Sequence, residues 1–172
     1  MRLEIRRVQG LAGGFAQQVV EAEQAALAVD VGAQPGLQRG EVALGEANSV
    51  GVNERMEVLE GLVARGVPAA KMMPGTGMPS ITDTVLLSKH AEKLGARGVL
   101  VLPPYYYKNP SDDGLFAFFS EVIQRIGSGL PIYLYNFPQQ TAIPFSFALI
   151  ARLLKEYPGT VRGAKDSSGN FE

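Results

Sequence analysis

Hydrophobic residues recur at helical spacing in four segments after residue 52, and short apolar runs separate these segments. The pattern is clearest in the third segment, where apolar residues stand at i, i+3, i+4, i+7 and i+11 before a Gly-Ser-Gly break: Leu115, Phe118, Phe119, Val122 and Ile126. We predict a first helix capped by Asn53 and ended by Gly66, and a second capped by Ser80 and ended by Gly95. The third helix runs through the five apolar residues, and the fourth spans about Ser146–Glu156.

The apolar runs between these helices are short and continuous, which is typical of strands that are buried on both faces. The predicted strands are 67–73, 99–102, 132–135 and 161–164. Strand and helix therefore alternate, and this order favours a parallel sheet covered by helices. The predicted fold class is α/β.

Residues 1–44 differ in composition from the rest of the chain. They contain no Lys, Ser, Thr, Tyr, Asn or His, whereas all these types occur in residues 45–172. Helix-favouring residues gather over 15–29, but no packing partner is evident. We therefore treat residues 1–44 as an atypical segment and hypothesise that they derive from a shifted reading frame or a wrong start.

Composition excludes several classes of function. A formal net charge of −1 gives no electrostatic reason to expect nucleic acid. No apolar stretch approaches the roughly 20 residues that cross a bilayer, and no secretory signal is evident, so a cytoplasmic protein without a membrane role is expected. The absence of cysteine excludes disulfides, thiolate metal sites and a cysteine nucleophile. No cluster of His, Asp and Glu has metal-ligand spacing.

Lys165 is the strongest candidate for chemistry, because it follows an apolar strand in the string Gly163-Ala164-Lys165-Asp166-Ser167-Ser168-Gly169. An amine on a partly desolvated strand end can attack a carbonyl and form a Schiff base, although a solvated strand-end lysine is the alternative. A tyrosine at the end of the preceding strand is its candidate partner. Tyr133 and Tyr135 share one face of that strand, so spacing alone does not choose between them.

These strings, together with Tyr135-Asn136-Phe137-Pro138 and the segment 103–108, resemble the dihydrodipicolinate synthase and N-acetylneuraminate lyase family of pyruvate-dependent class I aldolases. The resemblance runs from about Gly45 to Glu172. It implies a (β/α)8 TIM barrel in which Lys165 is the Schiff-base nucleophile and Tyr135 transfers protons. It also implies that Tyr106 enters the site of a second subunit, which makes a homo-oligomer the expected state, with loop packing as the alternative. A small 2-keto acid is the implied substrate, with no metal or organic cofactor.

The resemblance is incomplete in two places. A full barrel needs at least about 200 residues, and the clear strands correspond to the third to sixth, so the last two βα units are expected to be absent. The family's Gly-Thr-Thr-Gly-Glu turn is represented only by Gly45 and Glu46, which remain candidates for substrate binding. The preceding Ala43 and Leu44 have no hydroxyl with which to relay protons.

The same comparison bears on substrate choice. Where synthases of the family carry an arginine that holds a substrate carboxylate, this chain has Gln140, which cannot form a charge-assisted bidentate pair. A lyase acting on a 2-keto acid, such as a 2-keto-3-deoxy sugar acid, is therefore favoured. Dihydrodipicolinate synthase proper and a non-catalytic barrel fragment are the alternatives. His90 is expected on a solvated helix face, and Pro74–Gly77 as a turn at the barrel rim.

Overall fold

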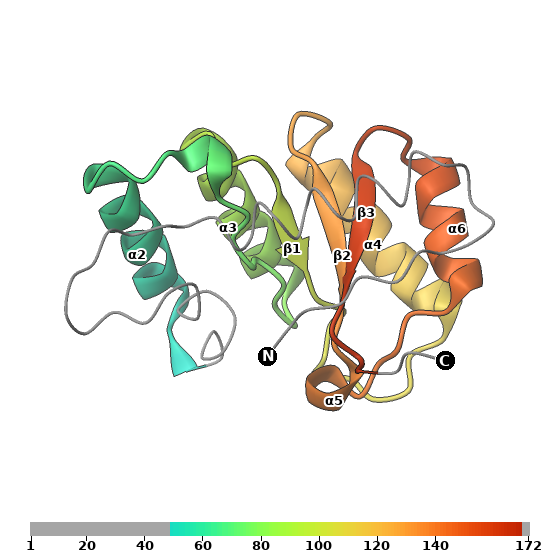
Figure 1. The fold of residues 1–172 in the computed structure, drawn as a ribbon. Coiled ribbons are helices and arrows are strands. Elements are labelled where there is room, and N and C mark those ends of the chain that lie inside the picture. Colours follow the sequence, from blue (N-terminus) through green and yellow to red (C-terminus); the bar gives the residue numbers. More distant parts are fainter. Residues whose placement is uncertain (1–48, 170–172) are drawn as a thin grey trace.

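The computed structural model describes residues 49–169, which form a parallel three-stranded sheet with helices along one side (Figure 1). The strands are β1 (Val99–Val101), β2 (Ile132–Asn136) and β3 (Val161–Asp166). The longer helices are α2 (Val52–Ala64), α3 (Ile81–Lys93), α4 (Asp112–Ile126) and α6 (Phe147–Glu156). Two short helical turns complete the elements: η2 (Ala69–Lys71) and α5 (Pro138–Thr141).

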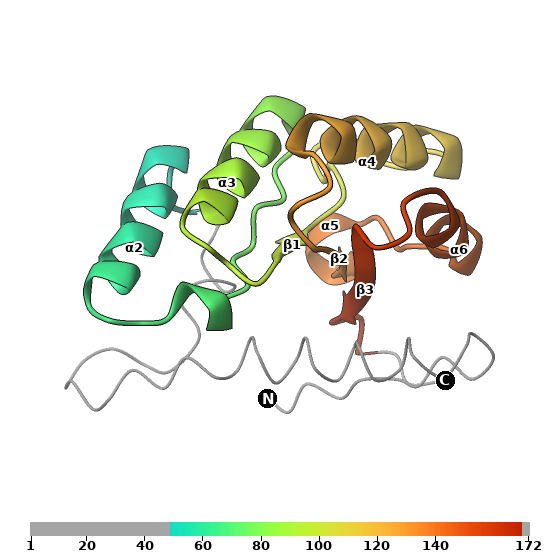
Figure 2. The ribbon, with the colours of Figure 1, turned by 90° about the horizontal axis from the view of Figure 1, so that it is seen from above.

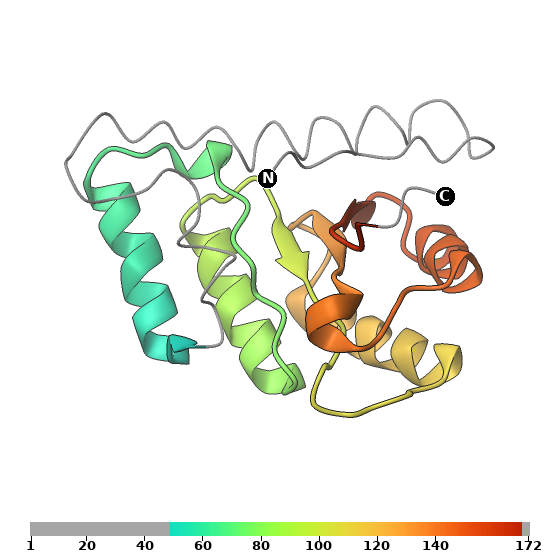
Figure 3. The ribbon, with the colours of Figure 1, turned by 60° about the horizontal axis from the view of Figure 1, so that its bottom comes forward.

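The sheet has the order β1-β2-β3, and both strand pairs are parallel. Viewed from above, α3, α4 and α6 lie on the same side of the sheet, and α2 packs beside α3 rather than on the strands (Figure 2). Because the strands are parallel neighbours, all three end at the same edge of the sheet. Figure 3 brings this edge forward and shows α5 beside the end of β2.

An extended segment, residues 72–76, runs along the outer edge of β1. Leu100 donates its backbone N–H to Pro74 at 3.0 Å and accepts from the N–H of Thr76 at 2.9 Å. The predicted strand over 67–73 is wrong, because Pro68 has no N–H and residues 69–71 form the η2 turn instead. The carbonyl of Met72 accepts from the N–H of Arg97, just before β1, at 3.1 Å. Pairing with β1 itself is limited to a single bridge, Gly75 with Leu100.

The two faces of the sheet carry different apolar clusters. On the helix side, side chains from every strand join the main core with α4 and α6: Val99, Val101, Ile132, Leu134 and Val161. On the other side, alternate residues of β1 and β2 form a smaller buried cluster with Met73 of the extended segment: Leu100, Tyr133 and Tyr135. This alternation follows from the two-residue period of a strand. The face opposite the main helices therefore carries the hydroxyl groups of Tyr133 and Tyr135.

A bulge in β3 sets which of its side chains reach that face. Pairing with β2 shifts after Ile132, whose partner is Val161, so that Tyr133 faces Gly163 and Arg162 is the extra residue. Val161 and Ala164 consequently both pack on the helix side although they are three residues apart.

The helix predictions are confirmed in type and approximate extent. Ser80 and Ser146 cap α3 and α6 by accepting from Asp83 N at 3.3 Å and Leu149 N at 3.0 Å. The prediction of Asn53 as a cap is wrong. Helix α2 begins at Val52 with Gly51 as its N-cap, and the Gly51 N–H donates to the Glu54 carboxylate at 2.7 Å.

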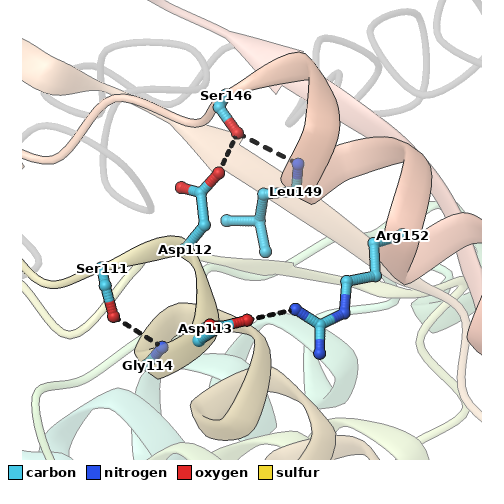
Figure 4. A network of polar contacts seen from close by, with 7 residues as sticks. All are labelled: Ser111, Asp112, Asp113, Gly114, Ser146, Leu149 and Arg152. Carbon is cyan, nitrogen blue, oxygen red and sulfur yellow. Dashed lines mark hydrogen bonds and ion pairs between the residues drawn. The ribbon is translucent and has the colours of Figure 1, made fainter.

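The start of α4 is joined to α6 by a surface polar network (Figure 4). The Ser146 hydroxyl donates to Asp112 at 2.5 Å, and Arg152 pairs with Asp113 at 2.5 Å. The Arg152 guanidinium also lies 3.7 Å from the centroid of the Phe116 ring. These contacts fix α6, and with it the entry into β3, against α4.

Candidate active site

Lys165 and Tyr135 lie side by side at the carboxyl ends of β3 and β2. They are direct partners in the parallel pairing, and the Lys165 Nζ is 4.5 Å from the centroid of the Tyr135 ring. Tyr135 is 5% exposed and stacks on Phe137, with the ring centroids 5.7 Å apart. Lys165 is partly buried. The structure thus brings together the amine and the phenol that the sequence singled out, at the strand edge where barrel enzymes place their chemistry.

The register also distinguishes between the two tyrosines that spacing left open. Tyr133 shares the buried cluster with Tyr135, but it lies opposite Gly163, two residues before Lys165. Tyr135 is therefore the tyrosine whose ring contacts the amine.

Burial raises the pKa of the Tyr135 hydroxyl, and a hydrogen bond from the Ser167 side chain partly opposes this shift. The phenol therefore remains protonated at neutral pH and is able to donate a proton. Ser167 belongs to the sequence motif around Lys165, but the motif alone assigned it no role. Its hydroxyl, two residues after the strand-end lysine, could have suggested one, but only the folded structure shows that Ser167 reaches Tyr135.

Behind this pair, Asn136 and Asp166 form a second pair of strand partners. The Asn136 Nδ2 donates to Asp166 Oδ1 at 2.6 Å, and the Asn136 Oδ1 accepts from the N–H of Phe145 at 3.2 Å. Asp166 also accepts from the N–H of Ser168 at 3.2 Å and from the Ser168 hydroxyl at 2.8 Å. The Gln139 amide donates to the carbonyl of Ser168, which ties α5 to the loop after β3.

A further polar group borders the same edge beyond β1. The Arg55 guanidinium donates to the Gly75 carbonyl at 2.5 Å and contacts the Met78 sulfur at 2.8 Å. The Tyr105 hydroxyl lies 4.0 Å from the same sulfur. Burial raises the pKa of Tyr105, and the charge of Arg55 opposes the shift. These contacts hold the segment 74–78 against the loop that follows β1.

The remaining candidates are Tyr106, Gly45 and Glu46. Tyr106 is 74% exposed in the loop after β1, with its ring 5.5 Å from that of Tyr107. Gly45 and Glu46 fall outside the described residues, as does the predicted helix over 15–29. The expectation that His90 is solvated is wrong: its side chain is 15% exposed, and Nε2 lies 3.4 Å from Glu60 because α2 packs on α3.

Between residues 49 and 169 there is no group of three or more His, Cys, Asp or Glu that could hold a metal ion. No helix in this part of the chain is long and apolar enough to cross a membrane.

The chain belongs to the dihydrodipicolinate synthetase family, whose sequence model matches residues 39–172. It is 37% identical over 129 residues to an uncharacterised DapA-like lyase of Chloroflexus aurantiacus and 34% identical over 128 residues to a 4-hydroxy-tetrahydrodipicolinate synthase of Rhizobium meliloti. Both alignments cover 74% of this chain and 42% of the relative. The chain therefore spans less than half the length of these curated relatives.

Solved structures agree with this assignment. Dihydrodipicolinate synthase from Agrobacterium tumefaciens superposes with a TM-score of 0.71 at 44% identity, over 73% of this chain and 44% of that one. YagE, a prophage protein of the same family from E. coli that was solved in complex with pyruvate, gives a TM-score of 0.61 at 34% identity, over 71% of this chain and 40% of that one. The described residues accordingly have the fold of part of a TIM barrel.

Proposed function

We propose that this chain carries the Schiff-base half of a pyruvate-dependent lyase, with Lys165 as the nucleophile and Tyr135 as the proton-transfer group. The observation that carries the proposal is the Lys165 Nζ at 4.5 Å from the buried Tyr135 ring, at the carboxyl edge of a parallel sheet. Family membership and a relative solved with pyruvate support it. In this proposal the described strands are the third to sixth of the barrel.

The proposed reaction begins with attack of the Lys165 amine on the carbonyl carbon of a 2-keto acid. The nitrogen loses a proton and the oxygen gains one, which gives a carbinolamine. The Tyr135 hydroxyl then donates a proton to the leaving hydroxyl, so that water departs and an iminium forms. Transfer of a proton from the adjacent carbon to the Tyr135 phenolate gives an enamine, which can attack an aldehyde; in reverse, the iminium draws electrons from a breaking carbon–carbon bond. No metal or organic cofactor enters these steps.

For the substrate, we propose pyruvate or a related 2-keto acid, with 2-keto-3-deoxy sugar acids as the favoured class. Gln140 is exposed on α5 and is neutral, so it offers a hydroxylated substrate hydrogen bonds rather than a cation for a carboxylate. Dihydrodipicolinate synthase proper is the second candidate, because several relatives bear that activity in their names.

We propose further that the working enzyme is a homo-oligomer. Tyr106 is exposed and stacked edge-on with Tyr107, so it is free to reach a neighbouring copy, as the family resemblance implies. The roles of Gly45 and Glu46 in substrate binding, the separate origin of residues 1–44 and a cytoplasmic location stay predictions from the sequence.

The test is reduction with borohydride in the presence of pyruvate, followed by peptide mapping. We expect an adduct on Lys165 that Lys165→Ala abolishes. Lys155→Ala, which removes an exposed lysine at the end of α6, is the matched control and should retain the adduct. An adduct of equal yield in Lys165→Ala would rule out this lysine as the nucleophile. A folded chain that forms no adduct would favour the non-catalytic alternative.

A further inference from the structure

The polar pair Asn136 and Asp166 occupies the strand positions immediately after Tyr135 and Lys165. Side chains alternate along a strand, so this pair lies on the opposite face of the sheet from the amine and the phenol. The hydrogen bond between Asn136 and Asp166 joins the last residues of β2 and β3 through their side chains.

The orientation of the Asn136 amide is fixed by its partners. The Phe145 N–H can only donate, so it must face the amide oxygen, and this leaves the amide nitrogen facing Asp166. The backbone carbonyl of Asn136 also accepts from the Ser167 N–H at 2.8 Å. One residue of β2 thus holds the segment before α6, the end of β3 and the loop beyond it.

Asp166 accepts three hydrogen bonds in this network. Its Oδ1 accepts from Asn136 and from the Ser168 N–H, and its Oδ2 accepts from the Ser168 hydroxyl. These bonds hold the loop that carries Ser167, whose side chain reaches the Tyr135 hydroxyl. Lys165 is therefore flanked on its C-terminal side by a segment whose position depends on Asn136.

We infer that Asn136 and Asp166 are positioning residues that hold the Lys165 amine against the Tyr135 ring, and that Asp166 does so as a hydrogen-bond acceptor rather than through its charge. The inference rests on the proposed function where it concerns reaction with pyruvate. The geometry itself is independent of that function.

The acceptor role distinguishes two substitutions of Asp166. In Asp166→Asn, the new amide oxygen can still accept from Asn136 and from the Ser168 N–H, and the new amide nitrogen can donate to the Ser168 hydroxyl, which rotates to accept. In Asp166→Ala these bonds are all lost. In Asn136→Asp, two carboxylates face each other 2.6 Å apart in place of a hydrogen bond.

The experiment uses the 172-residue chain and two measurements at Lys165. The first is the rate of borohydride trapping with pyruvate. The second needs no pyruvate: it is the extent of acetylation of Lys165 by limiting acetic anhydride, measured by mass spectrometry relative to the exposed Lys89 and Lys155. Asp113→Asn, which weakens a carboxylate contact between α4 and α6 on the far surface, is the matched control. Ser168→Ala, which removes a single bond to Asp166, serves if Asn136→Ala does not fold.

We expect Asn136→Ala, Asn136→Asp and Asp166→Ala to lower the trapping rate about tenfold or more, as displacement of a reacting group does. Their relative acetylation of Lys165 should rise by about threefold, since the amine leaves its partly buried position. Asp166→Asn and Asp113→Asn should stay within about twofold of the parent chain in both measurements.

Two results would overturn the inference. If Asp166→Asn lowers the trapping rate as much as Asp166→Ala does, Asp166 acts through its charge. If the relative acetylation of Lys165 is unchanged in Asn136→Ala and Ser168→Ala, the pair has no positioning role. If the parent chain does not trap pyruvate, the proposed function fails, while the acetylation ratios still decide the positioning role.

Discussion

Gly77 lies where the segment 72–76 turns away from β1, and there is no room for a side chain on it. A Cβ built on Gly77 would stand 2.2 Å from the backbone nitrogen of Leu102 and 2.9 Å from its Cα. The obstacle is backbone directly after β1, so it cannot be relieved by rotating a side chain. Overpacking of this kind costs about 1–3 kcal/mol or more.

We therefore predict that Gly77→Ala lowers the midpoint of thermal unfolding by about 2–12 °C, at about 2–4 °C per kcal/mol for a chain of this size. Gly61→Ala makes the same chemical change inside α2, where nothing lies within 4 Å of the added Cβ. Alanine is favoured over glycine in a helix by about 0.5–1 kcal/mol, so this control should raise the midpoint by about 1–4 °C. The assay is far-ultraviolet circular dichroism during heating. The reasoning fails if Gly77→Ala unfolds at or above the midpoint of the parent chain.

The remaining predictions concern titration and surface charge. Burial raises the pKa of both Tyr105 and Tyr135, so the unfolded chain releases these phenol protons first, and the free energy of unfolding should fall as the pH rises past about 10. Urea unfolding at several pH values should show a shallower fall for Tyr135→Phe, and an unchanged slope would contradict the assigned burial. Arg152→Ala should cost more stability than Asp113→Ala, because the arginine loses the Phe116 ring as well as the ion pair. The Asp113 change should stay within about 1 kcal/mol and shrink in high salt, whereas equal costs for the two variants would show that the ring contact contributes nothing.

Sequence patterns were sufficient where a local rule decides the structure. The helix periodicity of α4 and the capping hydroxyl of Ser80 depend on neighbours within one or two turns, and the structure confirms them. The same is true of the glycines that end the first two helices, since Gly66 and Gly95 adopt φ values of 88° and 85°.

The wrong predictions concern segments whose structure depends on contacts with residues distant in the sequence. The segment 67–73 is apolar enough for a strand, but Pro68 and the η2 turn delay its pairing with β1. His90 has charged neighbours in sequence, yet α2 covers it from across the helix pair. Helix α5 was missed because four residues are too few to show a period.

For the candidate site, the sequence motifs identified Lys165 and Tyr135, but they did not show that the two side chains are in contact. Whether Lys165 faces Tyr135 depends on pairing between β2 and β3, which are separated by α5 and α6. Ser167 and the Asn136–Asp166 pair were overlooked for the same reason, because their partners are some thirty residues away in sequence.

The bulge at Arg162 sets the alignment of the lysine with the tyrosine. If every residue of β3, Arg162 included, paired continuously with β2 from Val161 onward, Lys165 would lie opposite Asn136 instead of Tyr135. The amine would then point toward the helices. An exposed arginine thus supplies, through its backbone alone, the offset of one position that brings the amine to the phenol.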